Sequence, residues 1–485
     1  MELALSLDFQ SSTPLHRQVY DELRRAILTG RLLPGERVPS TRSLSQSLSI
    51  SRTTVTQGYE QLLSEGYLET RTGSGTFVCV QLPDALLQTG EVSTQKLAQP
   101  AALKLSRYAQ QMKMPFSLKP QPTVEISFRY GRPAIDQFPI ALWRKLISRH
   151  CLGDRQWLNY ALDIQGDEGL RTAIAHYLSR ARAVKCDASQ IVITNGTQQA
   201  LDLILRVLME PGETMAIEDP GYLSARRVFL SHGVNLLPIS VDESGLSVET
   251  LRELSTDTPV RLVYVTPSHQ FPTGATLSLS RRLALLNWAK ENGALIIEDD
   301  YDSEYRYGDR PIPALQGLDP SDSVLYIGTL SKVLFPSLRI GYLVLPYPLL
   351  PFIAQAKWLS DRQLPTLEQK VLTDFIQEGH LESHIRKMRS HYNSCRQVLV
   401  HSLQHHFGER VTILGEDAGI HIMVRFSIAI SDDELIDQAL CAGVELMSAR
   451  DYYLGENRVG EFIFGYGELD EVTISEGIRR LATFC

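Results

Sequence analysis

The sequence predicts two folded parts of different class, a small, mainly helical head and a large α/β body, joined by a polar linker. Three observations predict this division. Residues 1–80, the head, show helical periodicity and contain eight arginines but no lysine. Residues 81–122 are rich in glutamine, alanine and proline and poor in aromatic residues, which is typical of a linker. Residues 123–485, the body, alternate short apolar runs with amphipathic helical patterns, which indicates a parallel sheet covered by helices on both faces.

Length and composition agree with a globular protein of several domains. The 485 residues exceed one ordinary domain, and contents of 43% hydrophobic and 21% charged residues exclude a disordered or fibrous chain. The most apolar stretch, 341–354, is interrupted by three prolines, so we expect no membrane span. The net charge of −8 means that any nucleic-acid binding must come from a local cluster of basic residues.

The start of the chain and the cysteines predict a cytoplasmic protein. The first residues lack a basic region ahead of an apolar one, which argues against secretion. Six cysteines are scattered without paired spacing. We therefore expect reduced thiols, with neither a disulfide framework nor a zinc site.

Three helices are predicted in the head. Apolar residues at helical spacing place the first helix before Gly30, a second runs from Thr41 to Leu48, and Ser51 caps a third. Two short helices joined by a tight turn, with polar side chains opening the second, suit a reader of the DNA major groove. Arg52 can reach a guanine edge or a phosphate, and nearby hydroxyl groups suit phosphate oxygens.

A glycine-rich hairpin is predicted after these helices. Residues 66–78 form two short strands around a Gly-Ser-Gly tip, beside Arg71. A small helical domain that binds another protein is the alternative. The combination of the Ser-Arg-Thr-Thr helix start at 51–54 and the hairpin favours DNA binding instead.

The motifs of residues 12–78 resemble the winged helix-turn-helix of GntR-type regulators. These motifs are Leu-Pro-Gly-Glu-Arg-Val-Pro-Ser-Thr-Arg at 33–42, Ser-Arg-Thr-Thr-Val at 51–55 and Gly-Ser-Gly-Thr-Phe-Val at 73–78. The resemblance implies six DNA-contacting residues, which are Arg42, Ser51, Arg52, Thr53, Thr54 and Gly73.

In the body, polar residues follow several predicted strands. The strand at 191–194 runs into a glycine turn that opens a helix, where free N–H groups and the helix dipole favour an anion. After the strand at 294–297, Asp299 and Tyr301 share one face while Asp300 points the other way. A carboxylate at this edge of a parallel sheet lies where ligands bind, and it can keep a pyridine nitrogen protonated.

A lysine follows a third apolar strand. Lys332 has small and apolar neighbours, which favours a buried, neutral amine over a solvated one. Thr329 and Arg339 flank it with a hydroxyl and a guanidinium suited to phosphate. Tyr222, in the turn at 218–222, is placed to stack on a ring. Taken singly, each of these residues has an ordinary structural explanation.

Together these segments resemble fold-type I pyridoxal 5'-phosphate enzymes of the aspartate aminotransferase kind. The resemblance implies that Lys332 is the Schiff-base lysine, Asp299 the partner of the pyridine nitrogen and Tyr301 the partner of the ring oxygen. It implies a stacking tyrosine and a phosphate site, formed by Tyr222 and by Gly196, Thr197, Gln198, Thr329 and Arg339. It also implies a tyrosine that reaches the partner subunit and two arginines for an acidic group of the ligand, namely Tyr160, Arg450 and, as the weaker candidate, Arg226.

Two departures from the enzyme pattern concern turnover. The enzymes commonly place an asparagine before the proline of an Asn-Pro-x-Gly turn, where this chain has Phe271. Between Lys332 and Arg339, Pro336 stands where a glycine-containing loop is usual, and Thr329 replaces a usual serine. We expect the cofactor to bind and physiological turnover to be absent.

A GntR-like head joined to an aminotransferase-like body is similar to the MocR family of bacterial regulators. The resemblance implies a domain-swapped homodimer that binds promoter DNA and senses pyridoxal phosphate or a small amino compound. The main alternative is a working aminotransferase that carries a DNA-binding head, and a third is a scaffold without cofactor. The sequence leaves the target gene, the direction of regulation and the effector open.

Overall fold

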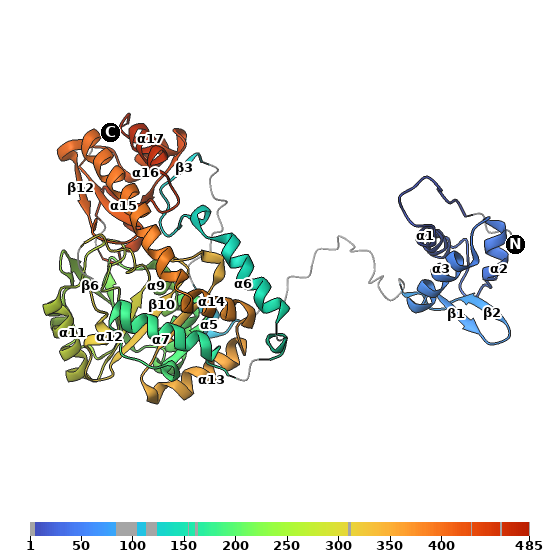
Figure 1. Cartoon of the computed structure of the whole chain (residues 1–485), viewed down its shortest axis with the longest axis horizontal. Helices are drawn as coiled ribbons and strands as arrows, with labels where there is room; N and C mark the ends of the chain where they lie inside the picture. Colours follow the sequence, from blue (N-terminus) through green and yellow to red (C-terminus); the bar gives the residue numbers. More distant parts are fainter. Residues whose placement is uncertain are drawn as a thin grey trace. The chain divides into compact units, whose positions relative to one another are not determined.

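The computed structural model describes residues 5–83, 104–112, 124–153, 155–160, 163–308, 312–427, 429–455 and 458–484. The chain divides into two compact units, Met1–Lys104 and Leu105–Cys485 (Figure 1). Most of the predicted linker, residues 84–103 and 113–122, lies outside the described residues. Within the described part of the chain, no helix combines the length and the apolar character that crossing a membrane requires.

Residues 5–80 of the first unit form a three-helix fold with a two-stranded wing. Its elements are α1 (Leu15–Leu28), α2 (Thr41–Ser47), α3 (Arg52–Ser64), β1 (Leu68–Arg71) and β2 (Gly75–Val78). The last two pair antiparallel. Hydroxyl groups start the second and third helices, since Ser40 Oγ accepts from Ser43 N and Ser51 Oγ accepts from Thr54 N, each at 3.1 Å. The predicted winged helix-turn-helix is confirmed.

The helices of the first unit pack around one apolar core. Val19 and Leu23 of α1 meet Val55 and Leu62 of α3, and all four side chains are buried. Gly58 allows close packing, because a Cβ there would lie 3.2 Å from the carbonyl oxygen of His16. The core therefore fixes α3 with its first turn, residues 52–54, directed away from the packed face.

The second unit is built on an eight-stranded sheet in the order β4-β11-β10-β9-β8-β5-β6-β7. The strands are β4 (Ile191–Thr194), β5 (Thr214–Asp219), β6 (Asn235–Asp242), β7 (Gly245–Leu246), β8 (Val260–Val265), β9 (Leu295–Asp300), β10 (Val324–Thr329) and β11 (Gly341–Val344). The five strands from β10 to β6 are mutually parallel, whereas β11 and β7 pair antiparallel with their neighbours.

Helices cover both faces of this sheet, as predicted. They are α6 (Ile140–Leu152), α7 (Glu168–Arg182), α8 (Gly196–Leu208), α9 (Leu223–Ser231), α10 (Val248–Leu254), α11 (Leu279–Asn292), α12 (Leu315–Leu318), α13 (Leu350–Asp361) and α14 (Thr366–Gln377). Neighbouring residues of β4 show the two faces, since Val192 packs in the core of α8 and α9 while Ile193 packs in the core of α7 and α14. Burial on both sides explains why the strands are apolar throughout.

A smaller layer follows along the chain. The long helix α15 (His380–Phe407) leads into the sheet β12-β13-β16-β15, formed by Val411–Leu414, His421–Phe426, Glu461–Gly465 and Met447–Ser448. The helices α16 (Asp432–Cys441) and α17 (Glu471–Leu481) and the parallel pair β14 (Val444–Glu445) and β3 (Ile126–Ser127) complete this layer, and α5 (Arg107–Gln111) precedes it in sequence. The pairing of β3 with β14 brings residues 126–131 beside the C-terminal layer and close to the main sheet.

Candidate cofactor site and nucleic-acid interface

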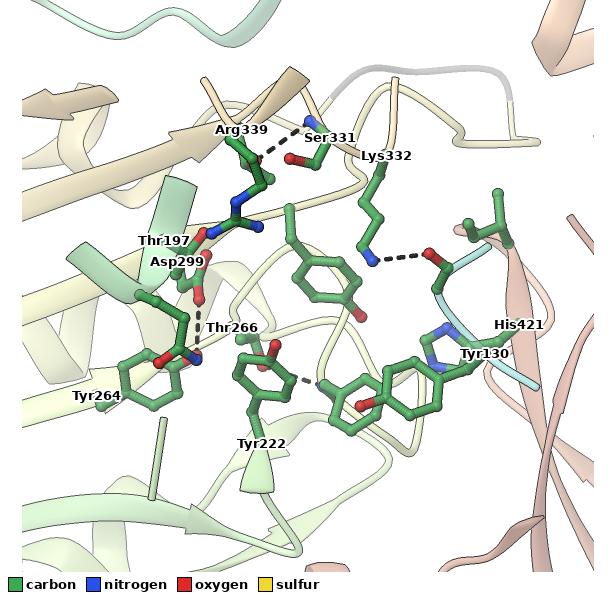
Figure 2. Close-up of a pocket in the computed structure, with 16 residues that line it drawn as sticks. Tyr130, Thr197, Tyr222, Tyr264, Thr266, Asp299, Ser331, Lys332, Arg339 and His421 are labelled. Atoms are coloured by element: carbon green, nitrogen blue, oxygen red, sulfur yellow. Dashed lines mark hydrogen bonds between the residues drawn. The ribbon is translucent and has the colours of Figure 1, made fainter. Parts of the chain in front are cut away.

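A cavity lies at the carboxyl ends of the parallel strands, where α/β folds bind ligands (Figure 2). We call it the Lys332 cavity. It is lined by Tyr130, Gly131, Thr197, Gln198, Tyr222, Tyr264, Thr266, Phe271, Asp299, Tyr301, Thr329, Ser331, Lys332, Arg339, Ile420 and His421. Two parts are distinguished below: the Arg339 end, with Thr197, Gln198, Thr329 and Ser331, and the His421 end, with Tyr130, Phe271 and Ile420.

The lysine that gives the cavity its name is buried. Lys332 stands three residues beyond the end of β10, and its Nζ donates a hydrogen bond to the carbonyl oxygen of Gly131 at 2.8 Å. Burial lowers the pKa of this amine, and the nearby Arg339 lowers it as well. A larger fraction of Lys332 is therefore neutral and nucleophilic than of an exposed lysine.

Asp299 presents a free carboxylate oxygen to the same cavity. Its Oδ2 accepts a hydrogen bond from Tyr264 Oη at 2.7 Å, while its Oδ1 is buried without a partner. Burial raises the pKa of Asp299 to about 7. A cationic donor at Oδ1 would satisfy this oxygen and restore the charged form, which is the contact that a protonated ring nitrogen makes.

The alternation predicted along β9 is confirmed. Asp300 points to the opposite face, where its Oδ2 accepts from Arg182 Nε at 2.8 Å and from Tyr326 Oη at 2.6 Å. Asp299 and Tyr301 both line the cavity. Tyr301 Oη donates to the carbonyl oxygen of His269 at 3.0 Å.

The Arg339 end gathers donors for an anion. Arg339 donates to the carbonyl oxygen of Asn195 at 3.1 Å, directly beside the first turn of α8. Gly196 is required here, because its φ is +66° and a Cβ would lie 2.9 Å from Arg339 Nη2. Ser331 Oγ is buried without a partner, and Thr197 and Gln198 bring the first turn of α8 to the same region. The first N–H groups of a helix lack partners within the helix and favour an anion. These groups fit a phosphate.

Aromatic rings line the remainder of the cavity. The ring centroid of Phe271 lies 5.5 Å from that of Tyr222 and 4.7 Å from that of Tyr130. The sequence singled out Tyr222 as the stacking residue, and it lines the cavity. Phe271, identified as a departure from the enzyme pattern, lines it as well.

Several lining residues were missed by sequence reasoning. Tyr130 and Gly131 come from the segment after β3, and Ile420 and His421 from the start of β13, so only tertiary packing brings them to the lysine. Tyr264 lies near the end of β8, the strand beside β9, and Thr266 directly follows that strand. This position was the available signal for both residues. Ser331 could have been identified most easily, because it is adjacent to Lys332 in the sequence.

Four predicted residues do not line the cavity. Gly196 is one of them, although it lies beside Arg339, and the other three are Arg450, Arg226 and Tyr160. Arg450 is 43% exposed and pairs with Asp433 Oδ1 at 3.1 Å. Arg226 is buried and donates to the backbone oxygen of Asp451 at 2.6 Å, which gives it a structural role. Tyr160 is 66% exposed, with its ring centroid 4.1 Å below the guanidinium of Arg362. The roles of these last three toward an effector or a partner subunit remain predictions.

The predicted DNA contacts form an exposed polar surface on the first unit. Arg42, Ser51, Arg52 and Thr53 are exposed, and Thr54 is half-buried at the start of α3. Arg52 Nε lies 3.4 Å from Thr41 Oγ1, which brings the starts of α2 and α3 together. Gly73 is exposed at the tip of the wing with a φ of +76°.

Comparisons with known proteins agree with the predicted classes of the head and the body. Residues 15–78 match the bacterial regulatory proteins of the gntR family, and residues 127–458 match aminotransferase class I and II. The chain is 38% identical to the probable rhizopine catabolism regulatory protein MocR of Rhizobium meliloti, over 98% of this chain and 95% of that protein. It is 30% identical to the pyridoxine biosynthesis regulator PdxR of Corynebacterium glutamicum, over 98% and 96%.

Among solved structures, a kynurenine aminotransferase from Pyrococcus horikoshii aligns with a TM-score of 0.70 and 29% identity, covering 79% of this chain and 94% of the enzyme. The body therefore has the fold-type I aminotransferase fold, as predicted. The chain belongs to the MocR-like family of HTH-type transcriptional regulators, in which a GntR-type DNA-binding head is joined to a class I and II aminotransferase-like body.

Proposed function

We propose that this regulator binds promoter DNA through its head and senses pyridoxal 5'-phosphate, or a small amino compound that reacts with it, in the Lys332 cavity. The observation that carries the proposal is the pairing of a buried amine with an unsatisfied carboxylate oxygen. Lys332 Nζ and Asp299 Oδ1 line the same cavity, and neither has an anionic or cationic partner within hydrogen-bond distance among the described residues.

The donor set of the cavity fits this cofactor. Bound pyridoxal phosphate supplies an aldehyde that condenses reversibly with primary amines. Lys332 would hold that aldehyde as a Schiff base, Asp299 would receive the ring N–H, and Tyr301 would lie at the ring oxygen. The phosphate would lie at the Arg339 end and the ring against Tyr222.

Sensing requires that the cavity and the head be coupled. A ligand shifts an equilibrium between two arrangements only if it binds one of them more tightly. We infer a homodimer, supported by large apolar side chains that are exposed on and near α6 and α13, including Ile140, Leu152, Phe352 and Leu359. Two heads in one dimer suit paired operator half-sites, and the domain-swapped arrangement is inferred from the family resemblance alone.

A working aminotransferase with a DNA-binding head is the second candidate. The observation that favours it is the set of lysine, aspartate, tyrosine and arginine in one cavity of an aminotransferase-like body. Phe271 weighs against it, because a phenyl ring cannot make the hydrogen bond that an asparagine makes at this position. Sustained transamination with an amino donor and a keto acceptor, at ordinary enzyme rates, would establish the enzyme instead.

Covalent attachment is the direct test of the cavity. Full-length protein incubated with pyridoxal phosphate and then treated with borohydride is expected to carry one adduct, located on Lys332 by mass spectrometry. Absence of both an adduct and a visible absorbance band would instead support a scaffold that holds no cofactor.

DNA binding is tested separately. Footprinting of the DNA upstream of this protein's own gene measures the affinity of the head. Arg52→Ala is expected to weaken this affinity by about tenfold, because one guanine or phosphate contact is lost. Arg25→Ala is the matched control, since Arg25 is 66% exposed on α1 and pairs with Glu22. Equal protection by the wild type and Arg52→Ala would remove Arg52 from the interface.

A further inference from the structure

One ring nitrogen on the wall of the Lys332 cavity lacks a hydrogen-bond partner. His421 opens β13, is 1% exposed and has an unpaired Nε2. The ring does form a hydrogen bond with the backbone of Pro272. Proline has no N–H group, so the carbonyl oxygen of Pro272 accepts and the ring donates through Nδ1.

This hydrogen bond determines what the unpaired nitrogen can do. Burial holds the pKa of His421 well below its ordinary value, and the nearby His269 and Lys332 lower it further. The ring is therefore neutral, with its single proton on Nδ1. Its Nε2 is left as a bare hydrogen-bond acceptor that cannot donate.

The surroundings of this acceptor combine aromatic side chains with one polar pair. The ring centroid of His269 lies 4.8 Å from that of His421, and His269 Nδ1 pairs with Asp302 at 2.9 Å. The ring centroid of Phe271 lies 5.3 Å from that of His421, the ring of Tyr130 lies 6.3 Å away, and Ile420 precedes it on the wall. Figure 2 shows His421 and Tyr130 on the side of Lys332 away from Arg339 and Asp299. A ligand at the His421 end thus meets the aromatic rings of Tyr130 and Phe271, the ring of His421 with its unpaired nitrogen, and the amine of Lys332.

A buried acceptor without a donor is unfavourable, so a ligand that supplies the donor gains affinity. A ligand of the same shape that lacks the donor leaves Nε2 unpaired and binds more weakly. A carboxylate oxygen facing Nε2 would place one acceptor against another. The geometry therefore favours an uncharged group that carries a polar hydrogen.

We propose that the His421 end is a specificity subsite for primary amines that carry a hydroxyl group, with Nε2 of His421 accepting the hydrogen bond from that hydroxyl. The inference rests on the proposed function, because the amino group of the ligand reacts at the cofactor that Lys332 holds. His421 is thus a specificity-determining residue.

Two substitutions distinguish the roles of the two ring nitrogens of His421. In His421→Asn the side-chain amide can still donate to Pro272, as Nδ1 does, but no atom replaces Nε2. In His421→Gln the longer side chain can place an acceptor near the position of Nε2. The two variants are of similar polarity and serve as matched controls for each other.

The probes are matched amines of equal length. Ethanolamine, 3-aminopropanol and 4-aminobutanol are compared with propylamine, butylamine and pentylamine, respectively. Three chain lengths are used because the distance between Lys332 and His421 determines which hydroxyl group can contact Nε2. Full-length protein loaded with pyridoxal phosphate is titrated with each amine. The midpoint is the amine concentration that produces half of the total change in the absorbance spectrum.

For wild type we expect at least one hydroxyalkylamine to bind about tenfold more tightly than its alkyl counterpart. The ratio of the alkylamine midpoint to the hydroxyalkylamine midpoint is expected to fall to about one in His421→Asn. In His421→Gln this ratio should be largely retained. Equal midpoints for every pair in wild type would overturn the inference, even if His421→Asn fails to fold. An unchanged ratio in folded His421→Asn would overturn it as well.

Two further outcomes are distinguished. Failure of wild type to take up pyridoxal phosphate would refute the proposed function itself, whereas normal uptake without discrimination refutes only the role of His421. A metal ion is the competing partner for Nε2, because ligand atoms of His269, Asp302 and His421 lie within 4.8 Å of one another. Stoichiometric Zn²⁺ binding by wild type, lost in His421→Asn, would assign Nε2 to the ion and overturn the inference.

Discussion

The two ends of the Lys332 cavity are built in different ways. At the Arg339 end, the groups that fit a phosphate come from the start of α8, directly after β4, and from the segment between the end of β10 and the start of β11. At the His421 end, Tyr130 and His421 come from segments about 290 residues apart in sequence, brought together by the pairing of β3 with β14 and the layer around β13. One end depends on local strand–turn sequences, and the other depends on how two layers pack.

Under the proposed function, this difference separates cofactor binding from the choice of ligand. A phosphate and a protonated ring nitrogen require fixed charges, which the turns of a parallel sheet supply rigidly. The shape of the His421 end depends on residues that can be exchanged without disturbing those turns. Relatives in one family can therefore keep a common cofactor site and respond to different amines.

The largest expected effect is at the lysine. Lys332→Ala removes the nucleophilic amine, so the borohydride-stable adduct and the visible absorbance band should both disappear. Lys290→Ala, at an exposed position on α11, is the matched control and should retain both. An adduct of equal yield in Lys332→Ala would show that attachment occurs at another amine.

A smaller loss is expected at the carboxylate. Asp299→Asn replaces a charge-assisted contact with a neutral one, and the affinity for pyridoxal phosphate should fall by tenfold or more, equivalent to about 1.4 kcal/mol for each factor of ten. Equilibrium dialysis of wild type and variant measures the change. An unaltered affinity would mean that the ring nitrogen does not lie at Asp299.

The same residue gives a dependence of stability on pH. Burial raises the folded-state pKa of Asp299 from 3.8 to about 7, so the folded state holds this proton more tightly than the unfolded state does. Its contribution to the free energy of unfolding is therefore present at low pH and is lost as the pH rises from about 4 to about 7. Burial raises the pKa of Glu218 and Glu298 to about 7 as well, and they act in the same direction.

Urea unfolding of cofactor-free protein between pH 5 and 8 measures the slope of the free energy of unfolding against pH. Tryptophan fluorescence reports on the body alone, because all four tryptophans lie beyond residue 142. Asp299→Asn should make the slope shallower, since an amide does not titrate. A steeper slope in the variant would contradict the assignment of the raised pKa to Asp299.

The smallest effect is expected outside the cavity. Arg450 forms an exposed ion pair with Asp433, so Arg450→Ala should change the free energy of unfolding by less than about 1 kcal/mol. The midpoints for hydroxyalkylamines should remain within about twofold of wild type. A larger loss for amines that carry a carboxylate would show that Arg450 enters the cavity and would support its predicted role.

The fold class was predictable because its signals are local. Buried strands such as β4 and β10 are continuously apolar, and the helix caps at Ser40 and Ser51 are short-range features. Lys332, Asp299 and Tyr301 were predictable for the same reason, since each stands at a fixed offset from the strand that positions it. Periodicity and strand ends carry this information in the sequence itself.

The His421 end was not predictable in this way. Nothing local distinguishes Tyr130 or Ile420 from ordinary core residues, and their importance depends on a neighbour that is distant in sequence. Arg450 was singled out from a short motif, and in the structure it pairs with Asp433, so its role toward a ligand stays a prediction. Contacts between layers must be observed, because sequence spacing does not encode them.

The hydrogen bond from Lys332 to the carbonyl oxygen of Gly131 has a further consequence. Gly131 follows β3 on the stretch of chain that leads back toward the head, and its oxygen depends on this amine. If Lys332 holds an aldehyde as proposed, its nitrogen keeps at most one hydrogen to donate, and the hydrogen bond to the carbonyl oxygen of Gly131 would be weakened or lost. Under the proposed function, the backbone at Gly131, in the segment that follows β3, would therefore be among the first parts of the body to respond to the cofactor.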